Sequence, residues 1–164
     1  MTLATLILGL VTLQRLGELV LARRNTRCLL ANGAIEVAPG HYPAIIAVHA
    51  AWLLGLWVFG WNAAVQPVWL AMFCALQLLR VWVIATLGSR WTTRIIVAPG
   101  RPLVADGPYR WLSHPNYVVV ASEIVVLPLT FGLPWFALLF TGLNAAILFV
   151  RIRAENQALG EAAQ

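Results

Sequence analysis

The chain has 164 residues, of which 61% are hydrophobic and only 10% are charged, and its formal net charge is +5. A soluble domain carries about a quarter charged residues, so this composition excludes an ordinary water-soluble fold and predicts an integral membrane protein. No pattern of interleaved aromatic and basic residues indicates a nucleic-acid partner. All eleven basic residues are arginines, a bias that a GC-rich genome would produce.

Five apolar passages follow one another along the chain: 3–22, 42–61, 67–87, 116–131 and 134–151. A helix that crosses a bilayer needs about 20 mainly apolar residues, so these passages predict about five transmembrane helices. Gly132 and Pro134 separate the last two, since glycine loosens a helix and proline ends one. Because the fourth passage is short, four spans with one kinked helix is the alternative.

The distribution of arginines favours five spans. With five, the segments 23–41, 88–115 and 152–164 share one side of the membrane and carry Arg23, Arg24, Arg27, Arg90, Arg94, Arg101, Arg110 and Arg153. The opposite side receives only 62–66 and the turn at Gly132, which have no charge. By the positive-inside rule the arginine side is cytoplasmic, which places the N-terminus outside and the C-terminus in the cytoplasm.

The expected fold is therefore all-α and polytopic, with a single membrane-embedded domain over 1–164 and no soluble Rossmann domain. The first 22 residues are predicted to be a retained span rather than a cleavable signal, because no positive charge precedes the apolar stretch. Cys28, in a predicted polar loop, and Cys74, in an apolar run, are not expected to pair, and no metal site is predicted.

Several polar residues fall inside the predicted spans, where a charged group costs at least a few kcal/mol and usually faces a cavity or a partner. Arg15 and Glu18 are three residues apart and can pair on one helical face. Gln77 and Arg80 have the same spacing, which suits either bonding between helices or the wall of a site. Glu123 needs a partner such as Arg80 or Arg15, in a structural ion pair or a functional site.

Other polar and aromatic residues have simpler interpretations. His49 and Asn144 suit hydrogen bonds between helices. Most of the eight tryptophans lie near predicted span ends, which is typical of an interfacial belt.

Two polar clusters flank the fourth and fifth passages. Asp106-Gly107-Pro108-Tyr109 predicts a turn, and a helix should begin near Pro115–Asn116, where free backbone N–H groups favour an anion. With His114 and the tyrosines, this predicts a pocket for a polar, partly aromatic cofactor. From the second cluster, Glu155 suits an ammonium or ribose hydroxyls, and Arg151 a carboxylate or oxyanion. The alternative is a helix cap with interfacial anchors.

These clusters carry a resemblance. The chain has Gly107-Pro108-Tyr109-Arg110, then His114-Pro115-Asn116-Tyr117, and then Arg151 with Glu155 four residues later. Together with the hydropathy, they resemble the isoprenylcysteine carboxyl methyltransferase family, most of all its small bacterial members. The early stretches Arg23-Arg24-Asn25 and Gly40-His41-Tyr42-Pro43 also resemble those members, so the likeness covers most of the chain.

The resemblance implies a membrane-embedded methyltransferase that uses S-adenosylmethionine. The cofactor contacts of the family fall on Arg101, Pro102, Leu103, Val104, Tyr109, His114, Pro115, Asn116, Tyr117 and Glu155, within the cytoplasmic loop 88–115 and beyond it. The substrate-contacting arginine falls on Arg151, and a further cofactor contact aligns loosely with Arg94. Ser113 stands where the family usually has arginine, and the chain stops soon after Glu155, without the tail that helps close the site in eukaryotic members.

The implied reaction is attack of a substrate oxygen on the sulfonium methyl group. A carboxylate acceptor needs no base and would be oriented by Arg151, whereas a phenol would use Glu123 or His114 as a base. The expected substrate is a lipid-like or isoprenyl molecule, or a prenylated protein, reached from the bilayer at the cytoplasmic face of a bacterial inner membrane. Rival hypotheses are an NADPH-dependent, sterol-reductase-like enzyme and a non-catalytic membrane scaffold.

Overall fold

The computed structural model describes residues 2–100, 102 and 104–162, with side chains as far as Glu155 except that of His41. The described part consists of five α-helices, three short 3-10 helices and two short strands. The α-helices are α1 (Leu3–Ala31), α2 (Tyr42–Gly60), α3 (Pro67–Leu87), α4 (Pro115–Thr130) and α5 (Pro134–Ala162). The other elements are η1 (Pro39–His41), η2 (Gly88–Arg90), η3 (Gly107–Arg110), β1 (Ile35–Glu36) and β2 (Ile96–Val97).

The prediction of a helical integral membrane protein is confirmed. By length and composition, α1, α2, α3 and α5 can each cross a membrane, and α4 is a shorter apolar helix. Only 17–22% of the residues in these spans are buried, and many of the exposed ones are large and apolar, such as Leu13, Leu54, Leu78 and Leu138. A surface of this kind is suited to lipid rather than to water.

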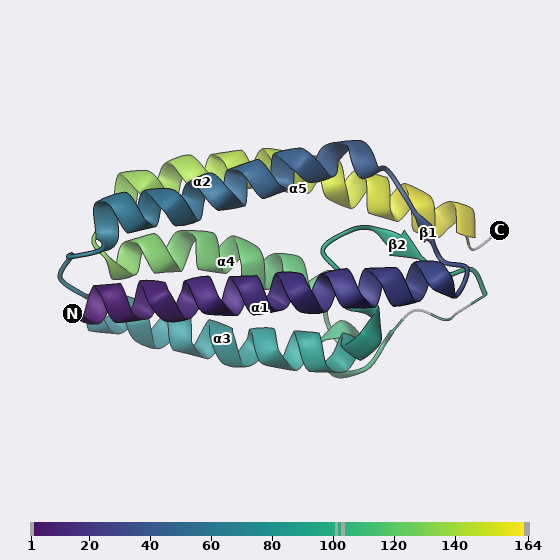
Figure 1. The fold of residues 1–164 in the computed structure, drawn as a ribbon, viewed down its shortest axis with the longest axis horizontal. Helices are drawn as coiled ribbons and strands as arrows, with labels where there is room; N and C mark the ends of the chain where they lie inside the picture. Colours follow the sequence, from purple (N-terminus) through teal and green to yellow (C-terminus); the bar gives the residue numbers. More distant parts are fainter. Residues whose placement is uncertain (1, 101, 103, 163–164) are drawn as a thin grey trace.

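Helix α4 is the most enclosed of the five. Its 16 residues span about 24 Å, less than the roughly 30 Å of a hydrocarbon core. It packs against α3, α5 and α2 and lies in the middle of the bundle in Figure 1. Val119 and Leu127 are completely buried, and Ile124 is almost so. Since protein rather than lipid covers most of this helix, it needs less apolar length than the others.

The helices run alternately along the long axis of the molecule (Figure 1). The connections 32–41 and 88–114 and the C-terminal part of α5 lie at one end, called the polar end below. The turns 61–66 and 131–133 lie at the other, next to the N-terminus. Helices α4 and α5 are separate and antiparallel, joined at Gly132 with φ +68°, so the structure favours five passages over four with a kink.

The first and last helices extend beyond the apolar passages predicted from the sequence. The first apolar passage ends at residue 22, but α1 continues to Ala31, and the last ends at 151, but α5 continues to Ala162. Hydropathy marks where a helix leaves the membrane, not where it stops. Arginine and alanine are good helix formers, and the first residue that breaks α1 is Gly33, with φ +83°. Cys28 accordingly lies on an exposed face of α1, not in a loop.

The interfacial belt explains only part of the tryptophans. Trp61 and Trp135 are exposed near the end that holds the N-terminus, as a belt requires. Trp52 and Trp91 are 3% and 2% exposed and lie inside the protein. Their burial depends on how distant segments pack together, which the position of a tryptophan in a span does not indicate.

Candidate functional site

A cavity of about 690 Å³ opens at the polar end between the loop 88–114, the start of α4 and the end of α5. Eight of the twelve residues predicted from the sequence line it: Pro102, Val104, Tyr109, His114, Asn116, Tyr117, Arg151 and Glu155. Pro115 is buried in the first turn of α4 and does not line the cavity. Arg101 and Leu103 lie outside the described residues, and Glu123 lies deeper in the bundle.

Tyr117 joins the two polar clusters. Its hydroxyl donates a hydrogen bond to the carboxylate of Glu155 and accepts one, 2.7 Å long, from Nε of Arg151. The ring of His114 stacks on the ring of Tyr117, with 5.2 Å between centroids, and its Nδ1 lies 3.9 Å from Glu155. Arg151 and Glu155 share a face of α5 because residues four apart are neighbours on a helix. The structure therefore brings both clusters to one wall of the cavity.

The first turn of α4 differs from the expected anion site. Pro115 occupies the first helical position, which its fixed φ favours. The backbone N–H groups of Tyr117 and Val118 both donate to the carbonyl oxygen of His114. These two amides are therefore occupied, and only that of Asn116 is left to face a ligand in this turn.

Tyr109 lies on η3 at the edge of the cavity. Burial raises the pKa of its phenol to about 12, and the nearby carboxylate of Glu155 acts in the same direction. Its hydroxyl therefore stays protonated at neutral pH and is available as a hydrogen-bond donor.

The position of η3 depends on Gly107, which has φ +54°. A Cβ atom there would lie 2.6 Å from Oγ1 of Thr86 and 3.2 Å from Nε1 of Trp82. Gly107→Ala is expected to lower the free energy of unfolding by about 2–4 kcal/mol, through left-handed strain and overpacking together. Chemical denaturation in detergent measures this change.

Gly100→Ala is the matched control, because Gly100 also has a positive φ but nothing within 4 Å of the added Cβ. It should show only the strain, about 1–2 kcal/mol. Equal losses in the two variants would mean that the contact between η3 and α3 is not tight.

A second cavity, of about 360 Å³, lies within the apolar part of the bundle between α1, α2, α4 and α5. Its wall is largely apolar and includes Ile45, Ile46, Leu53, Ile124 and Ile147. Both cavities are lined by the same five residues: Trp91, Thr92, Asn116, Tyr117 and Arg151. These residues form the partition between a polar cavity at the membrane surface and an apolar one inside the membrane.

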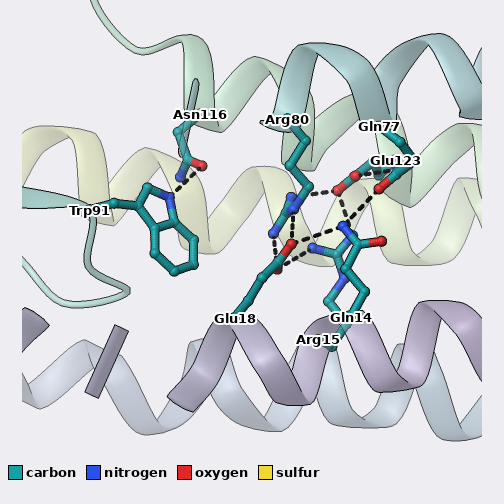
Figure 2. A network of polar contacts seen from close by, with 8 residues as sticks. All are labelled: Gln14, Arg15, Glu18, Gln77, Arg80, Trp91, Asn116 and Glu123. Atoms are coloured by element: carbon teal, nitrogen blue, oxygen red, sulfur yellow. Dashed lines mark hydrogen bonds and ion pairs between the residues drawn. The ribbon is translucent and has the colours of Figure 1, made fainter. Parts of the chain in front are cut away.

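Trp91 was not predicted to belong to a site. Its indole Nε1 donates a hydrogen bond of 3.4 Å to Oδ1 of Asn116 (Figure 2). Its backbone carbonyl oxygen accepts a hydrogen bond of 2.8 Å from Nδ2 of Asn25 on α1. Asn25 also bonds the carbonyl of Gly88. A buried asparagine on α1 thus fixes the first turn of the loop, and the loop places Trp91 in the partition.

The segment 95–100, which contains β2, also lines the first cavity and was not predicted from the sequence. Ile35 and Glu36 of β1 pair with Val97 and Ile96 of β2. Arg94, the loosely aligned cofactor contact, lines the cavity and forms an ion pair with Glu36 at 2.8 Å. The α1–α2 connection is thereby attached to the loop that walls the cavity.

The buried charges within the spans form one network (Figure 2). Arg80 donates to Glu18 at 2.5 Å and to Glu123 at 2.8 Å, and Arg15 donates to the same two carboxylates at 2.9 Å. Gln77 donates to Glu123 at 2.7 Å and accepts from Gln14 at 2.8 Å. Two cations and two anions balance, so this network is neutral and joins α1, α3 and α4.

Both partners considered for Glu123 are therefore present in the structure. Its side chain is 3% exposed and lines the second cavity but not the first. It follows Tyr117 by six residues on α4, or about 9 Å along the axis. Of the two candidate bases, His114 lies at the first cavity and Glu123 does not. Gln77 and Arg80 both make bonds between helices, and Arg80 also lines the second cavity, so both of their interpretations apply to Arg80.

Comparisons with known proteins show the family of the chain. The family model described as "Isoprenylcysteine carboxyl methyltransferase (ICMT) family" matches residues 69–161. The chain is 40% identical over 161 residues to a protein of Bacillus subtilis (strain 168) named "Uncharacterized protein YpbQ", covering 95% of this chain and 96% of the relative. No solved structure shows a significant match. The match includes α3, the loop, both polar clusters and the partition between the cavities, and the chain belongs to the isoprenylcysteine carboxyl methyltransferase family.

Proposed function

We propose that this membrane methyltransferase uses S-adenosylmethionine to methylate an oxygen, of a carboxylate or a phenol, on a lipid-like or isoprenyl substrate at the cytoplasmic face of the membrane. The observation that carries the proposal is the pair of cavities. One is polar and open at the membrane surface, the other is apolar and lies within the spans, and Arg151, Tyr117 and Asn116 line both.

The first cavity suits S-adenosylmethionine in size and chemistry. Its 690 Å³ lies within the 300–1,000 Å³ of typical small-molecule sites. Glu155 supplies a carboxylate for the ammonium group, and the stacked rings of His114 and Tyr117 offer an aromatic surface. The protonated hydroxyl of Tyr109 adds a donor. When bound, the cofactor supplies an electrophilic methyl group, which goes to the acceptor oxygen while the carbon–sulfur bonding pair stays with sulfur.

Arg151 is suited to orient the acceptor. Its Nε is used by Tyr117, but the structure gives its two terminal nitrogens no hydrogen bond to any described residue. Arg151 borders both cavities, and the residue is 9% exposed. It can therefore hold a carboxylate or a developing phenolate at the partition, and fixing the reacting oxygen supplies much of the acceleration of such a transfer.

The second cavity is suited to the apolar part of the acceptor. The helices that line it also expose large apolar side chains such as Leu54 and Leu138, which suits entry of a lipophilic molecule from the bilayer. A carboxylate acceptor needs no base in this arrangement. For a phenol, His114 is the better placed of the two candidate bases, because it borders the first cavity.

The proposed location is a bacterial inner membrane with the polar end in the cytoplasm. Of the described arginines, Arg23, Arg90, Arg94 and Arg110 lie at or next to this end, and the turns at the other end have no charge. A fluorescent-protein fusion after residue 164 should be bright, and an alkaline-phosphatase fusion at residue 64 should be active. The reverse pattern would contradict this orientation.

Calorimetric titration of the purified protein tests the cofactor. We expect S-adenosylhomocysteine to bind with micromolar affinity and NADPH not to bind. His114→Ala should weaken the binding about tenfold, because it removes the ring stacked on Tyr117, while the helical content is unchanged. Binding of NADPH alone would support the reductase, and binding of neither would support the scaffold.

A further inference from the structure

One level of the bundle carries polar side chains from all five helices. This polar belt consists of Gln14, Arg15, Glu18, His49, Gln77, Arg80, Glu123 and Asn144. The hydrogen bond between Tyr117 and Arg151 fixes the register of α4 against α5. Away from the polar end, Glu123 is six residues from Tyr117 on α4, or about 9 Å along the helix axis. Asn144 is seven residues from Arg151 on α5, or about 10 Å. The two residues therefore lie at the same depth in the bundle.

His49 lies at a similar depth on α2. The close approach of Gly55 to Phe136 fixes the register of α2 against α5, since a Cβ on Gly55 would lie 2.6 Å from that ring. Towards the polar end, His49 is six residues from Gly55 and Asn144 is eight from Phe136, or about 9 and 12 Å. His49 and Asn144 are therefore within about one turn of the same level, and both line the second cavity.

The belt has two halves of different character. On α1, α3 and α4, its polar groups bond one another in the neutral network of Figure 2. On α2 and α5 they do not. Asn144 is only 5% exposed and lines the second cavity, and its side chain makes no hydrogen bond to any described residue. If hydrocarbon filled the cavity, this amide would be left without a partner at a cost of about 1–3 kcal/mol, whereas a ligand with a polar group at this point would avoid that cost.

His49 completes this unbonded half. Its Nδ1 lies 2.8 Å from the carbonyl oxygen of Ile45. Because a carbonyl oxygen only accepts, Nδ1 carries the hydrogen, and the neutral ring leaves Nε2 as an acceptor. The cavity wall thus holds an acceptor on α2 and an amide, both donor and acceptor, on α5. A hydrocarbon chain satisfies neither of them, whereas a hydroxyl or carbonyl group satisfies one or both.

We infer that His49 and Asn144 bind a second oxygen of the acceptor, so that the substrate is a lipid with a hydroxyl or oxo group roughly 10 Å from the oxygen that is methylated. This inference rests on the proposed function, because it takes the occupant of the second cavity to be the methyl acceptor. His49 and Asn144 are then specificity-determining residues, about two turns of helix away from Arg151.

Binding of matched lipids to the purified protein tests the inference without requiring turnover. The probes are a saturated fatty acid and its mid-chain hydroxy and oxo derivatives, and the same three chains on a phenol head group. Native mass spectrometry gives the dissociation constant of each. The protein should bind the oxygenated chain about tenfold more tightly than the matched hydrocarbon. Equal affinities would overturn the inference.

Asn144→Leu keeps the size of the side chain and removes its hydrogen bonds. This variant should reduce the preference for the oxygenated chain over the matched hydrocarbon to about twofold or less, and it should leave the affinity for the hydrocarbon chain unchanged. His49→Phe, on another helix, should act in the same direction and decides the matter if Asn144→Leu does not fold. Asn62→Leu, in the exposed α2–α3 turn, should retain the full preference. A parallel loss of affinity for both kinds of chain in both variants would show that these residues only shape the cavity.

Methyl transfer from labelled S-adenosylmethionine to the same probes separates the two proposals. Transfer to a head group without any preference for oxygenated chains would leave the proposed function standing and overturn this inference. A preference in binding that is lost in Asn144→Leu, with no transfer to either head group, would support the lipid site and count against the proposed reaction.

Discussion

Glu155→Gln is expected to weaken the binding of S-adenosylhomocysteine by about 10- to 150-fold. Glutamine has the same shape and keeps an oxygen that accepts from the hydroxyl of Tyr117, so the partition should stay in place. What is lost is the negative charge that faces the ammonium group of the ligand, and a hydrogen bond to a charged group contributes about 1.5–3 kcal/mol. Calorimetric titration in detergent measures the change.

Two comparisons make this prediction sharper. Methylthioadenosine has the nucleoside but no ammonium group, so its affinity should change less than threefold in Glu155→Gln. Asp106→Asn removes an exposed carboxylate from the loop before α4 and should leave both affinities unchanged. If methylthioadenosine and S-adenosylhomocysteine weakened equally, Glu155 would bind the ribose rather than the ammonium group.

Arg80→Met is expected to cost about 3–5 kcal/mol of unfolding free energy, the largest change in stability that the structure suggests. The guanidinium of Arg80 donates three hydrogen bonds to Glu18 and Glu123 and is 6% exposed. Without it, two buried carboxylates are left with Arg15 alone, and an uncompensated charge within the spans is costly. Unfolding in mixed detergent micelles, followed by circular dichroism, measures the loss.

A second substitution tests whether charge balance is the cause. Adding Glu18→Gln to Arg80→Met restores neutrality and leaves the ion pair of Arg15 with Glu123. The double variant should therefore be more stable than Arg80→Met by about 1–3 kcal/mol. Arg23→Met, on an exposed face of α1, should cost less than 0.5 kcal/mol. A double variant less stable than either single one would show that packing, not charge, dominates.

Hydropathy and the placement of charges predicted the number of apolar helices and their alternating direction. Both signals reflect the contact of each segment with lipid or water, and neither depends on how the helices pack. The helix ends were not predictable in the same way. Nothing in the hydropathy of residues 23–31 distinguishes a loop from a helix that leaves the bilayer, and only Gly33 shows where α1 stops.

The site was predictable to the extent that local spacing determines it. The four-residue spacing of Arg151 and Glu155 and the proline at the start of α4 put Tyr117 and Glu155 within reach of each other. Trp91 was not predictable, because its burial depends on Asn25, 66 residues earlier, bonding its backbone. The pairing of β1 with β2 was not predictable either, because two residues per strand show no alternation.

The central claim is that the loop before α4 and the end of α5 enclose one cofactor. A structure of the wild-type protein determined with S-adenosylhomocysteine tests it most directly. The ligand should lie in the 690 Å³ cavity, with its ammonium group at Glu155 and its nucleoside near Tyr109 and Tyr117. A ligand bound elsewhere, or contacts with only one of the two clusters, would contradict the account.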